Sequence, residues 1–164
     1  MSKSILVIDD NADIRENTAE ILELAGYRTF TAENGKRGVD IAIKEKPSVI
    51  VCDIMMPELD GYGVLHLLRK NADTQTIPFI FLTAKTERSD FRKGMEMGAD
   101  DYITKPFDEV ELLDAIEIRL KKKEILDAGY SSQDAVTRFI KDIKESGLIQ
   151  HLSDNYATES YSKK

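Results

Sequence analysis

The sequence is poor in three features that would each point to a particular class of protein. Its 164 residues include one cysteine, Cys52, so no disulfide can form within the chain, and the apolar run around it predicts a buried thiol. No apolar run approaches the roughly 20 residues that a membrane-spanning helix needs. The 23 basic residues are outnumbered by 30 acidic ones, and a net charge of −7 argues against a surface that binds nucleic-acid phosphates. We therefore expect no membrane span and no direct nucleic-acid binding by this chain.

The first residues also lack the apolar stretch of a secretory signal. Met1–Ser4 leads directly into a short strand-like run that ends in two aspartates. We therefore expect a cytoplasmic protein.

Short apolar runs alternate with amphipathic stretches along most of the chain, which favours a parallel sheet covered by helices on both faces. The fold class that this alternation predicts is α/β, a flavodoxin-like (βα)5 doubly wound parallel sheet with strand order 2-1-3-4-5 and a C-terminal helical extension. The predicted strands are Ser4–Ile8, Tyr27–Ala32, Ser48–Cys52, Pro78–Leu82 and Asp101–Thr104. The first predicted helix ends before Gly26. The other four span Lys36–Lys46, Tyr62–Lys70, Arg88–Met97 and Asp108–Asp127.

Polar residues that can cap helices stand at the start of several of these helical stretches. Asn11 or Asp13 can cap the first helix, and Asn34 can cap the second. Asp108 with Glu111 three residues later is a variant of the capping box and predicts the start of the fifth helix.

Four of the predicted strands end at residues that carry reactive side chains: Asp9 with Asp10, Asp53, Thr83 and Lys105. In open α/β sheets, functional groups gather at the carboxyl ends of the strands, so we expect these side chains to converge at one edge. Crowded carboxylates repel one another, and a hard cation such as Mg²⁺ relieves that repulsion. The set therefore suits a divalent cation and a phosphoryl group.

Asp53 is the best candidate nucleophile, because a carboxylate can accept a phosphoryl group to give an acyl phosphate. Lys105 would contribute a positive charge and Thr83 a hydroxyl donor to the phosphoryl oxygens. The alternative for Asp9 and Asp10 is that they only cap the first helix.

Four segments closely resemble the receiver domain of two-component response regulators: Ile5–Asp10, Val49–Gly61, Phe81–Ala84 and Gly98–Phe107. Their motifs agree with the family in identity, order and spacing, and the match covers about residues 3–124. The resemblance implies a signalling phosphoacceptor, not an enzyme, that catalyses only its own phosphotransfer and dephosphorylation. Its partner would be a sensor histidine kinase or phosphotransfer protein, whose phosphohistidine donates to Asp53.

The resemblance also implies how Mg²⁺ is bound. Asp10 would be the main direct ligand and Asp9 would act largely through water. Asp53 and the main-chain carbonyl of Met55 would complete the protein ligands.

The remaining site residues follow from the same resemblance. Thr83 would move toward the phosphoryl group, and that movement is coupled in the family to an inward turn of an aromatic residue, here Tyr102. The bond between Lys105 and Pro106 would be cis.

The sequence says less about the output, meaning the process that the phosphorylated receiver domain would control. We divide the chain into a receiver domain over residues 1–124 and a segment over residues 125–164, which is either a helical extension or a linker to an effector domain absent from this chain. An amphipathic pattern over Ala135–Ile143 predicts a helix there. Leu148 and Ile149 would add one further turn.

A homodimer is one option for the output, and two surfaces could form it: the C-terminal helix, or the face of the fourth helix, fifth strand and fifth helix. The residues that could contribute charges to that face are Asp100, Asp101, Glu111 and Arg119. The fit to the family's charge pattern is incomplete, because Ala115 and Glu117 stand where basic residues are usual.

One enzyme class remains as an alternative. Haloacid-dehalogenase-like phosphatases and phosphotransferases also combine an aspartate nucleophile, Mg²⁺, a Thr or Ser and a Lys. Their nucleophile lies on the first strand in an Asp-x-Asp motif, whereas Asp9–Ala12 lacks that spacing.

Overall fold

The computed structural model describes residues 2–84, 88–129 and 132–146. The strands are β1 (Ser4–Ile8), β2 (Arg28–Ala32), β3 (Val49–Cys52), β4 (Phe79–Thr83) and β5 (Asp101–Thr104). The helices are α1 (Ala12–Leu24), α2 (Gly35–Glu45), α3 (Gly61–Lys70), α4 (Arg88–Glu96), α5 (Glu109–Asp127) and α6 (Ser132–Ser146). The five predicted strands and the predicted helices over residues 36–127 are all present, and none of their boundaries moves by more than one residue.

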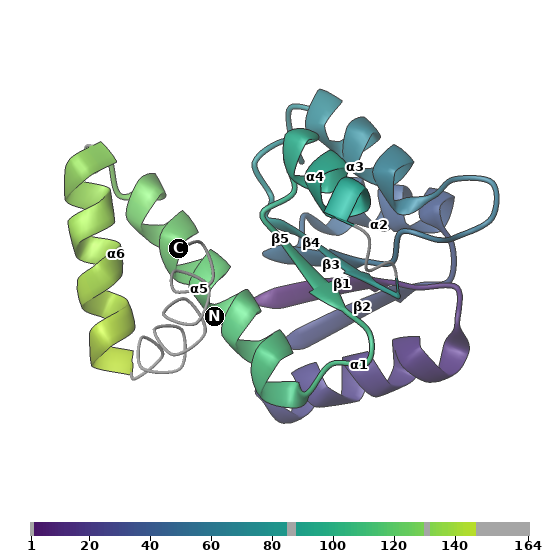
Figure 1. Ribbon diagram of the computed structural model, residues 1–164, viewed down its shortest axis with the longest axis horizontal. Coiled ribbons are helices and arrows are strands. Elements are labelled where there is room, and N and C mark those ends of the chain that lie inside the picture. Colours follow the sequence, from purple (N-terminus) through teal and green to yellow (C-terminus); the bar gives the residue numbers. More distant parts are fainter. Residues whose placement is uncertain (1, 85–87, 130–131, 147–164) are drawn as a thin grey trace. The chain divides into compact units, whose positions relative to one another are not determined.

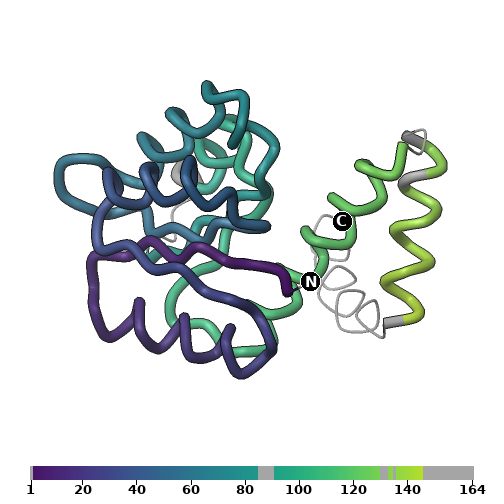
Figure 2. The backbone as a smooth tube through the Cα atoms, turned by 180° about the vertical axis from the view of Figure 1, so that it is seen from behind, coloured from purple at the N-terminus to yellow at the C-terminus, as the bar shows by residue number. Residues whose placement is uncertain are grey.

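The five strands form one parallel sheet in the order β2-β1-β3-β4-β5, which confirms the predicted flavodoxin-like topology. Figure 1 shows α1 on one face of the sheet and α2, α3 and α4 on the other. The view from behind in Figure 2 agrees, with α1 in purple on one side and α2 and α3 in blue on the opposite side. The sheet is therefore buried between two helical layers.

The central strands explain why the apolar runs in the sequence are continuous instead of alternating. Every residue of Val49–Cys52 and of Phe79–Thr83 is buried, because both faces of a doubly wound sheet are covered. Cys52 is among them, as predicted, with none of its surface exposed.

The helix caps show which polar residues start the helices. The Asn11 and Asn34 side chains accept hydrogen bonds from the amides three residues ahead, at 3.0 and 2.8 Å. Asp13 is therefore not the cap of α1 but lies in its first turn. Asp108 accepts from the Glu111 amide at 2.8 Å, as the capping-box pattern predicts.

An arginine at the end of α3 connects the beginnings of β4 and β5. Arg69 donates to the carbonyls of Ile77 at 2.8 Å and Gly98 at 2.9 Å, and to Asp100 Oδ2 at 3.3 Å. The same oxygen of Asp100 accepts from the Phe79 amide at 2.8 Å. Asp100, which the sequence suggested for a dimer face, is thus engaged within its own fold.

The chain divides into two compact units, Met1–Ile116 and Glu117–Lys164, and the division falls within α5. In the second unit, α6 confirms the predicted C-terminal helix; Ile143 on it is buried, while Val136 is 58% and Ile140 43% exposed. The further turn expected at Leu148 and Ile149 lies outside the described residues. The boundary between residues 124 and 125 stays a prediction.

None of the helices in the described part of the chain is long and apolar enough to cross a membrane.

Gly61, the first residue of α3, lies close to the main chain of Asp53 and Ile54, which follow β3, and this close approach can be tested by substitution. A Cβ atom at Gly61 would lie 2.4 Å from the Asp53 carbonyl oxygen and 2.8 Å from Ile54 Cα, both of them main-chain atoms. We expect Gly61→Ala to lower the free energy of unfolding by about 1–3 kcal/mol, because the backbone must shift. Urea unfolding followed by circular dichroism measures the change.

Gly63→Ala is the matched control for this substitution. Its Cβ would meet the end of the Leu59 side chain at 2.5 Å, which can rotate away, and alanine has the better helix propensity. Gly63→Ala should therefore stay within about 1 kcal/mol of the parent protein. Equal losses in both variants would contradict the proposed close approach at Gly61.

Candidate functional site

The strand ends bring three carboxylates together at one edge of the sheet. Asp9 follows β1 and Asp53 follows β3, and the Asp53 amide donates to the Ile8 carbonyl at 2.9 Å. Carboxylate oxygens of Asp9, Asp10 and Asp53 all lie within 4.8 Å of one another. Asp9 and Asp53 are buried, whereas Asp10 is exposed. The predicted acidic cluster therefore forms, with one member facing solvent.

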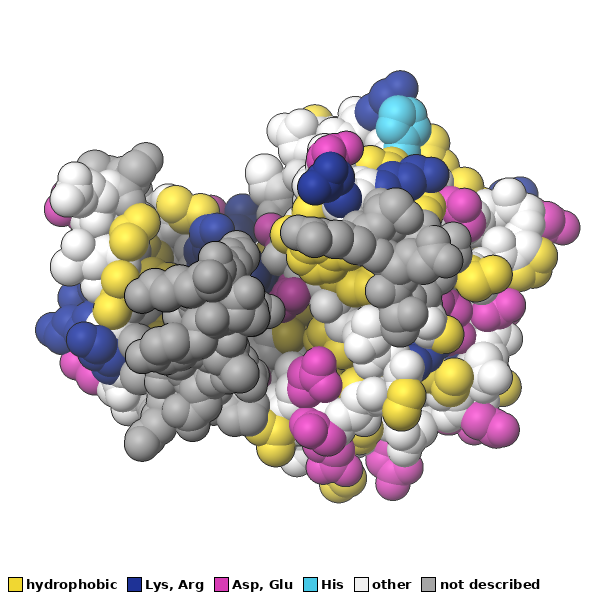
Figure 3. Space-filling view, viewed as in Figure 1, with side chains coloured by type: hydrophobic (Ala, Val, Ile, Leu, Met, Phe, Trp, Pro, Cys, Tyr) yellow, Lys and Arg dark blue, Asp and Glu magenta, His cyan; other side chains and the backbone are white. Residues whose placement is uncertain are grey.

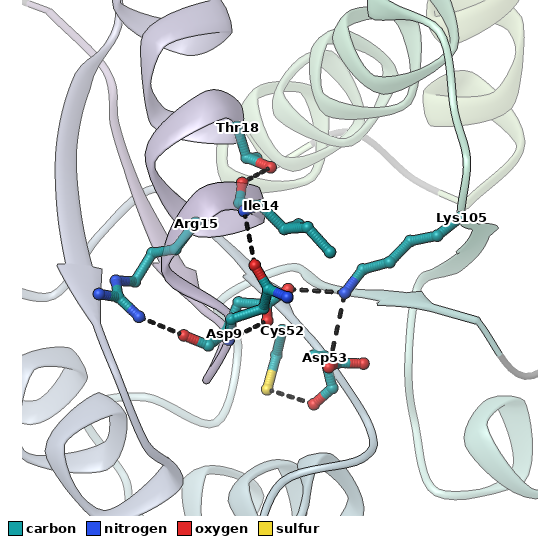
Figure 4. Close-up of polar contacts among 8 residues, drawn as sticks. Asp9, Ile14, Arg15, Thr18, Cys52, Asp53 and Lys105 are labelled. Atoms are coloured by element: carbon teal, nitrogen blue, oxygen red, sulfur yellow. Dashed lines mark hydrogen bonds and ion pairs between the residues drawn. The ribbon is translucent and has the colours of Figure 1, made fainter.

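Lys105 reaches into this cluster from the loop after β5 (Figure 4). Its Nζ lies 2.7 Å from Asp9 Oδ2 and 3.5 Å from Asp53 Oδ2, and the Lys105 side chain is only 13% exposed. The Lys105–Pro106 peptide bond is cis, as expected. The ammonium group therefore contacts both buried carboxylates, and the shorter contact is with Asp9.

Thr83 is the last residue of β4 and is fully buried. Its carbonyl oxygen accepts a hydrogen bond from the Lys105 amide at 2.8 Å, so the hydroxyl and ammonium residues stand at adjoining strand ends. The structure thus brings Thr83, Lys105 and the three aspartates to one edge.

Burial and charge together set the behaviour of the Asp53 carboxyl. Desolvation raises the pKa of Asp53, and Asp9 raises it further, while Lys105 and hydrogen bonds from the main chain of Ile54 and Met55 lower it. One ammonium group therefore offsets only part of the negative charge of the cluster. A divalent cation with oxygen ligands fits the remaining charge and the short distances between the carboxylates.

The two oxygens of the Asp9 carboxylate already have protein donors. Oδ1 accepts from the Asn11 amide at 2.9 Å, and Oδ2 accepts from Lys105. Asp10, which is exposed, is consequently better placed than Asp9 to bind a cation directly.

Tyr102 lies on β5 and is half-buried against α4. Its ring centroid is 5.4 Å from that of Phe91 and 6.5 Å from that of Phe81, both in edge-to-face geometry. Phe91 is 45% exposed. The aromatic contact therefore extends from the sheet to the surface of α4.

Sequence reasoning missed two residues that contact the predicted site residues. Arg15 donates to the Asp9 carbonyl, and Phe91 packs on Tyr102. A basic residue in the first turn of the helix after Asp9 and Asp10 was an available signal for the first. Nothing in the sequence pattern singled out Phe91.

A largely apolar depression of about 580 Å³ adjoins the site between α1 and the loop after β5. Ile14 and Phe107 contribute apolar surface to it, and Lys105 and Asp13 contribute polar groups. Exposed acidic side chains gather over α1, drawn in magenta at the lower edge of Figure 3. The surface beside the cluster therefore combines apolar and acidic character.

Comparison with known proteins gives a consistent result. A family model described as response regulator receiver domain matches residues 5–117. The chain is 46% identical over 122 residues to a probable transcriptional regulator ycf27 of Porphyra purpurea, covering 74% of this chain and 49% of that protein. It is 41% identical over 122 residues to the phosphate regulon transcriptional regulatory protein PhoB of Pseudomonas aeruginosa, covering 74% of this chain and 53% of PhoB.

Solved structures agree with the sequence comparisons. A response regulator receiver domain protein from Clostridium thermocellum superposes with a TM-score of 0.71 at 30% identity, covering 76% of this chain and 98% of that one. The chain spans about half the length of the curated relatives it matches.

Cys52, the buried last residue of β3, directly precedes Asp53, and the reactivity of its thiol tests how tightly the protein packs there. Burial raises the pKa of the Cys52 thiol well above its usual value, and the nearby Asp53 and Asp9 add to the shift. The thiol donates to the Asp53 carbonyl at 3.2 Å. We expect Ellman's reagent to modify native Cys52 about 1,000-fold more slowly than the urea-unfolded chain, since reaction requires a protein opening that costs several kcal/mol. Rapid reaction of the native protein would contradict this packing.

Proposed function

Since the chain belongs to the receiver-domain family of response regulators, we propose that Asp53 accepts a phosphoryl group from the phosphohistidine of a sensor histidine kinase or phosphotransfer protein. The observation that supports this role is the placement of a buried Asp53 beside Lys105, at 3.5 Å, and within the carboxylate cluster. A carboxylate oxygen of Asp53 forms the new O–P bond as the N–P bond of phosphohistidine breaks, and the imidazole leaves. The chain catalyses only this transfer and its own later dephosphorylation.

The donor set of the cluster suits Mg²⁺. Asp10, Asp53 and the main-chain carbonyl of Met55 would bind the ion, and Asp9 would act through water because both of its carboxylate oxygens have protein donors. When bound, Mg²⁺ offsets negative charge on the phosphoryl oxygens. The residues of the chain then have to hold the acceptor oxygen of Asp53 in position for attack on the phosphorus atom.

Lys105 has a second role in this scheme. It is shared between Asp9 and Asp53 at 2.7 and 3.5 Å, so phosphoryl oxygens on Asp53 would compete for the same ammonium group. The Thr83 hydroxyl would donate to a further phosphoryl oxygen from the adjoining strand end. Both contacts strengthen only when the phosphoryl group is present.

The output side of the proposal begins at Tyr102. Movement of Thr83 toward the phosphoryl group opens space for the Tyr102 ring to turn inward, which changes its contact with Phe91 on α4. Because Phe91 is 45% exposed, this change alters a surface that a second copy or an effector can bind.

The kinase partner would contact the depression between α1 and the loop after β5. This surface lies next to Lys105 and combines the apolar residues Ile14 and Phe107 with acidic side chains on α1. A helical partner that presents its phosphohistidine there needs apolar side chains flanked by basic ones.

The relatives support a role in transcription, because two of them carry names of transcriptional regulators. The chain covers only about half of each, so DNA binding is proposed for an output domain joined to residues 125–164, which would then act as a linker. This chain itself is not proposed to bind DNA.

The haloacid-dehalogenase-like alternative receives less support. The family match is to receiver domains, and the candidate nucleophile follows β3 instead of standing on β1. Steady turnover of a generic phosphatase substrate would revive it.

We expect Asp53→Asn to abolish phosphorylation by acetyl phosphate with Mg²⁺, because the amide cannot form an acyl phosphate. Intact-protein mass spectrometry detects the phosphoryl group as a gain in mass. Asp40→Asn, at an exposed position on α2, is the matched control and should be labelled like the parent protein. Persistent labelling of Asp53→Asn would overturn the assignment of the acceptor.

A second test concerns the surface around Tyr102. We expect beryllofluoride with Mg²⁺, a mimic of the bound phosphoryl group, to convert the full chain from monomer to dimer in light scattering coupled to size exclusion. The exposed apolar residues Phe91 and Met95 on α4 offer surface for that association. Asp53→Asn should stay monomeric under the same conditions. An unchanged mass of the parent protein would remove dimerisation as the output.

A further inference from the structure

Arg15, in the first turn of α1, is hydrogen-bonded to the loop after β1 that contains Asp9 and Asp10. Its Nη1 donates to the main-chain carbonyl oxygen of Asp9 at 2.9 Å, as the dashed line in Figure 4 shows. Its own amide donates to the Asn11 carbonyl, also at 2.9 Å. The side chain is half-buried. Both contacts bind the turn after β1, so this residue restrains the turn from the side of the helix.

The position of Arg15 is unusual for a basic residue. It is in the first turn of α1, where the helix dipole disfavours cations and favours acidic groups such as the neighbouring Asp13. A carbonyl oxygen accepts its hydrogen bond although acidic residues are adjacent in the sequence. Electrostatics at the helix end therefore does not explain Arg15, and the contact with the Asp9 carbonyl does.

The Asp9 carbonyl belongs to the peptide group that joins Asp9 to Asp10. A peptide group is planar, so fixing its oxygen also fixes the direction of the Asp10 amide and Cα. The other polar groups of Asp9 have partners as well: its amide donates to Ala32, and its carboxylate accepts from Asn11 and Lys105. Arg15 thus supplies the restraint on the one peptide plane that both aspartates share.

We infer that Arg15 is a positioning residue for the cation site: by holding the Asp9–Asp10 peptide plane, it keeps both carboxylates directed at Asp53 and so raises the affinity for Mg²⁺. The inference rests on the proposed function, which assigns Mg²⁺ to this cluster. Residues that orient metal ligands without touching the metal commonly change its affinity by 10- to 100-fold.

Charge and positioning predict opposite results when Arg15 is removed. Loss of a positive charge near three carboxylates would by itself strengthen the binding of a cation. Loss of the restraint on the peptide plane would weaken it. The sign of the change in Mg²⁺ affinity therefore separates the two effects.

The experiment measures Mg²⁺ affinity in the full chain from the rise in unfolding free energy with Mg²⁺ concentration. We expect Arg15→Gln to raise the apparent Kd about tenfold. Arg15→Lys keeps the charge and one donor, and its Kd should lie between those of Arg15→Gln and the parent protein. Arg37→Gln removes an exposed positive charge on α2 and should leave the Kd within about twofold.

An equal or lower Kd in Arg15→Gln would overturn the inference. A loss of stability without Mg²⁺ and an unchanged Kd would also overturn it, because Arg15 would then serve only the fold. If Arg15→Gln does not fold, Arg15→Lys decides by the same comparison, since a Kd no higher than that of the parent protein rejects the role.

Asp10→Asn distinguishes failure of this inference from failure of the proposed function. If Mg²⁺ stabilises Asp10→Asn as much as the parent protein, the cation site itself is misassigned. If Asp10→Asn loses that stabilisation while Arg15→Gln keeps it, only the role of Arg15 is wrong.

Discussion

Crowding of negative charge at the carboxyl edge of the sheet is the constraint on which the rest of the structure depends. Three carboxylates meet within 4.8 Å, and two of them are buried. A buried charge is tolerated only when it is paired and hydrogen-bonded, and Lys105 supplies the positive charge at 2.7 Å from Asp9 and 3.5 Å from Asp53. The fold therefore has to hold these side chains together against their own repulsion.

Main-chain hydrogen bonds hold these side chains together, because the hydrogen bonding between neighbouring strands continues past the ends of the strands. The Asp53 amide donates to Ile8 on β1, the Asp9 amide to Ala32 on β2, and the Lys105 amide to Thr83 on β4. Each functional residue is thus bonded to the neighbouring strand at the point where its own strand ends. The rigidity of the site follows from that of the sheet, and the order β2-β1-β3-β4-β5 decides which residues become neighbours.

The same logic explains what the sequence could and could not predict. Apolar runs that end in Asp53 or Lys105 predict both the strands and the meeting of their ends, because parallel strands share one carboxyl edge. Contacts that depend on how a helix packs on the sheet could not be predicted from the sequence. Phe91 reaches Tyr102 because Gly94 lets α4 approach the sheet, where a Cβ would lie 2.9 Å from the Phe81 ring. Leu24 fits the apolar pattern of α1 yet is 82% exposed at its end.

The contacts on the two sides of the site differ in kind: hydrogen bonds surround Asp9, and aromatic contacts surround the Tyr102 ring. The peptide group of Asp9 and its carboxylate are fixed by directional hydrogen bonds from Arg15, Asn11 and Lys105. Tyr102 packs through aromatic edges, contacts worth about 0.5–1.5 kcal/mol each that tolerate reorientation of the ring. If Asp53 is phosphorylated as proposed, the new charge would arise beside carboxylates that are held by hydrogen bonds. The structural response would then be directed to the aromatic contacts of Tyr102, toward the surface of α4.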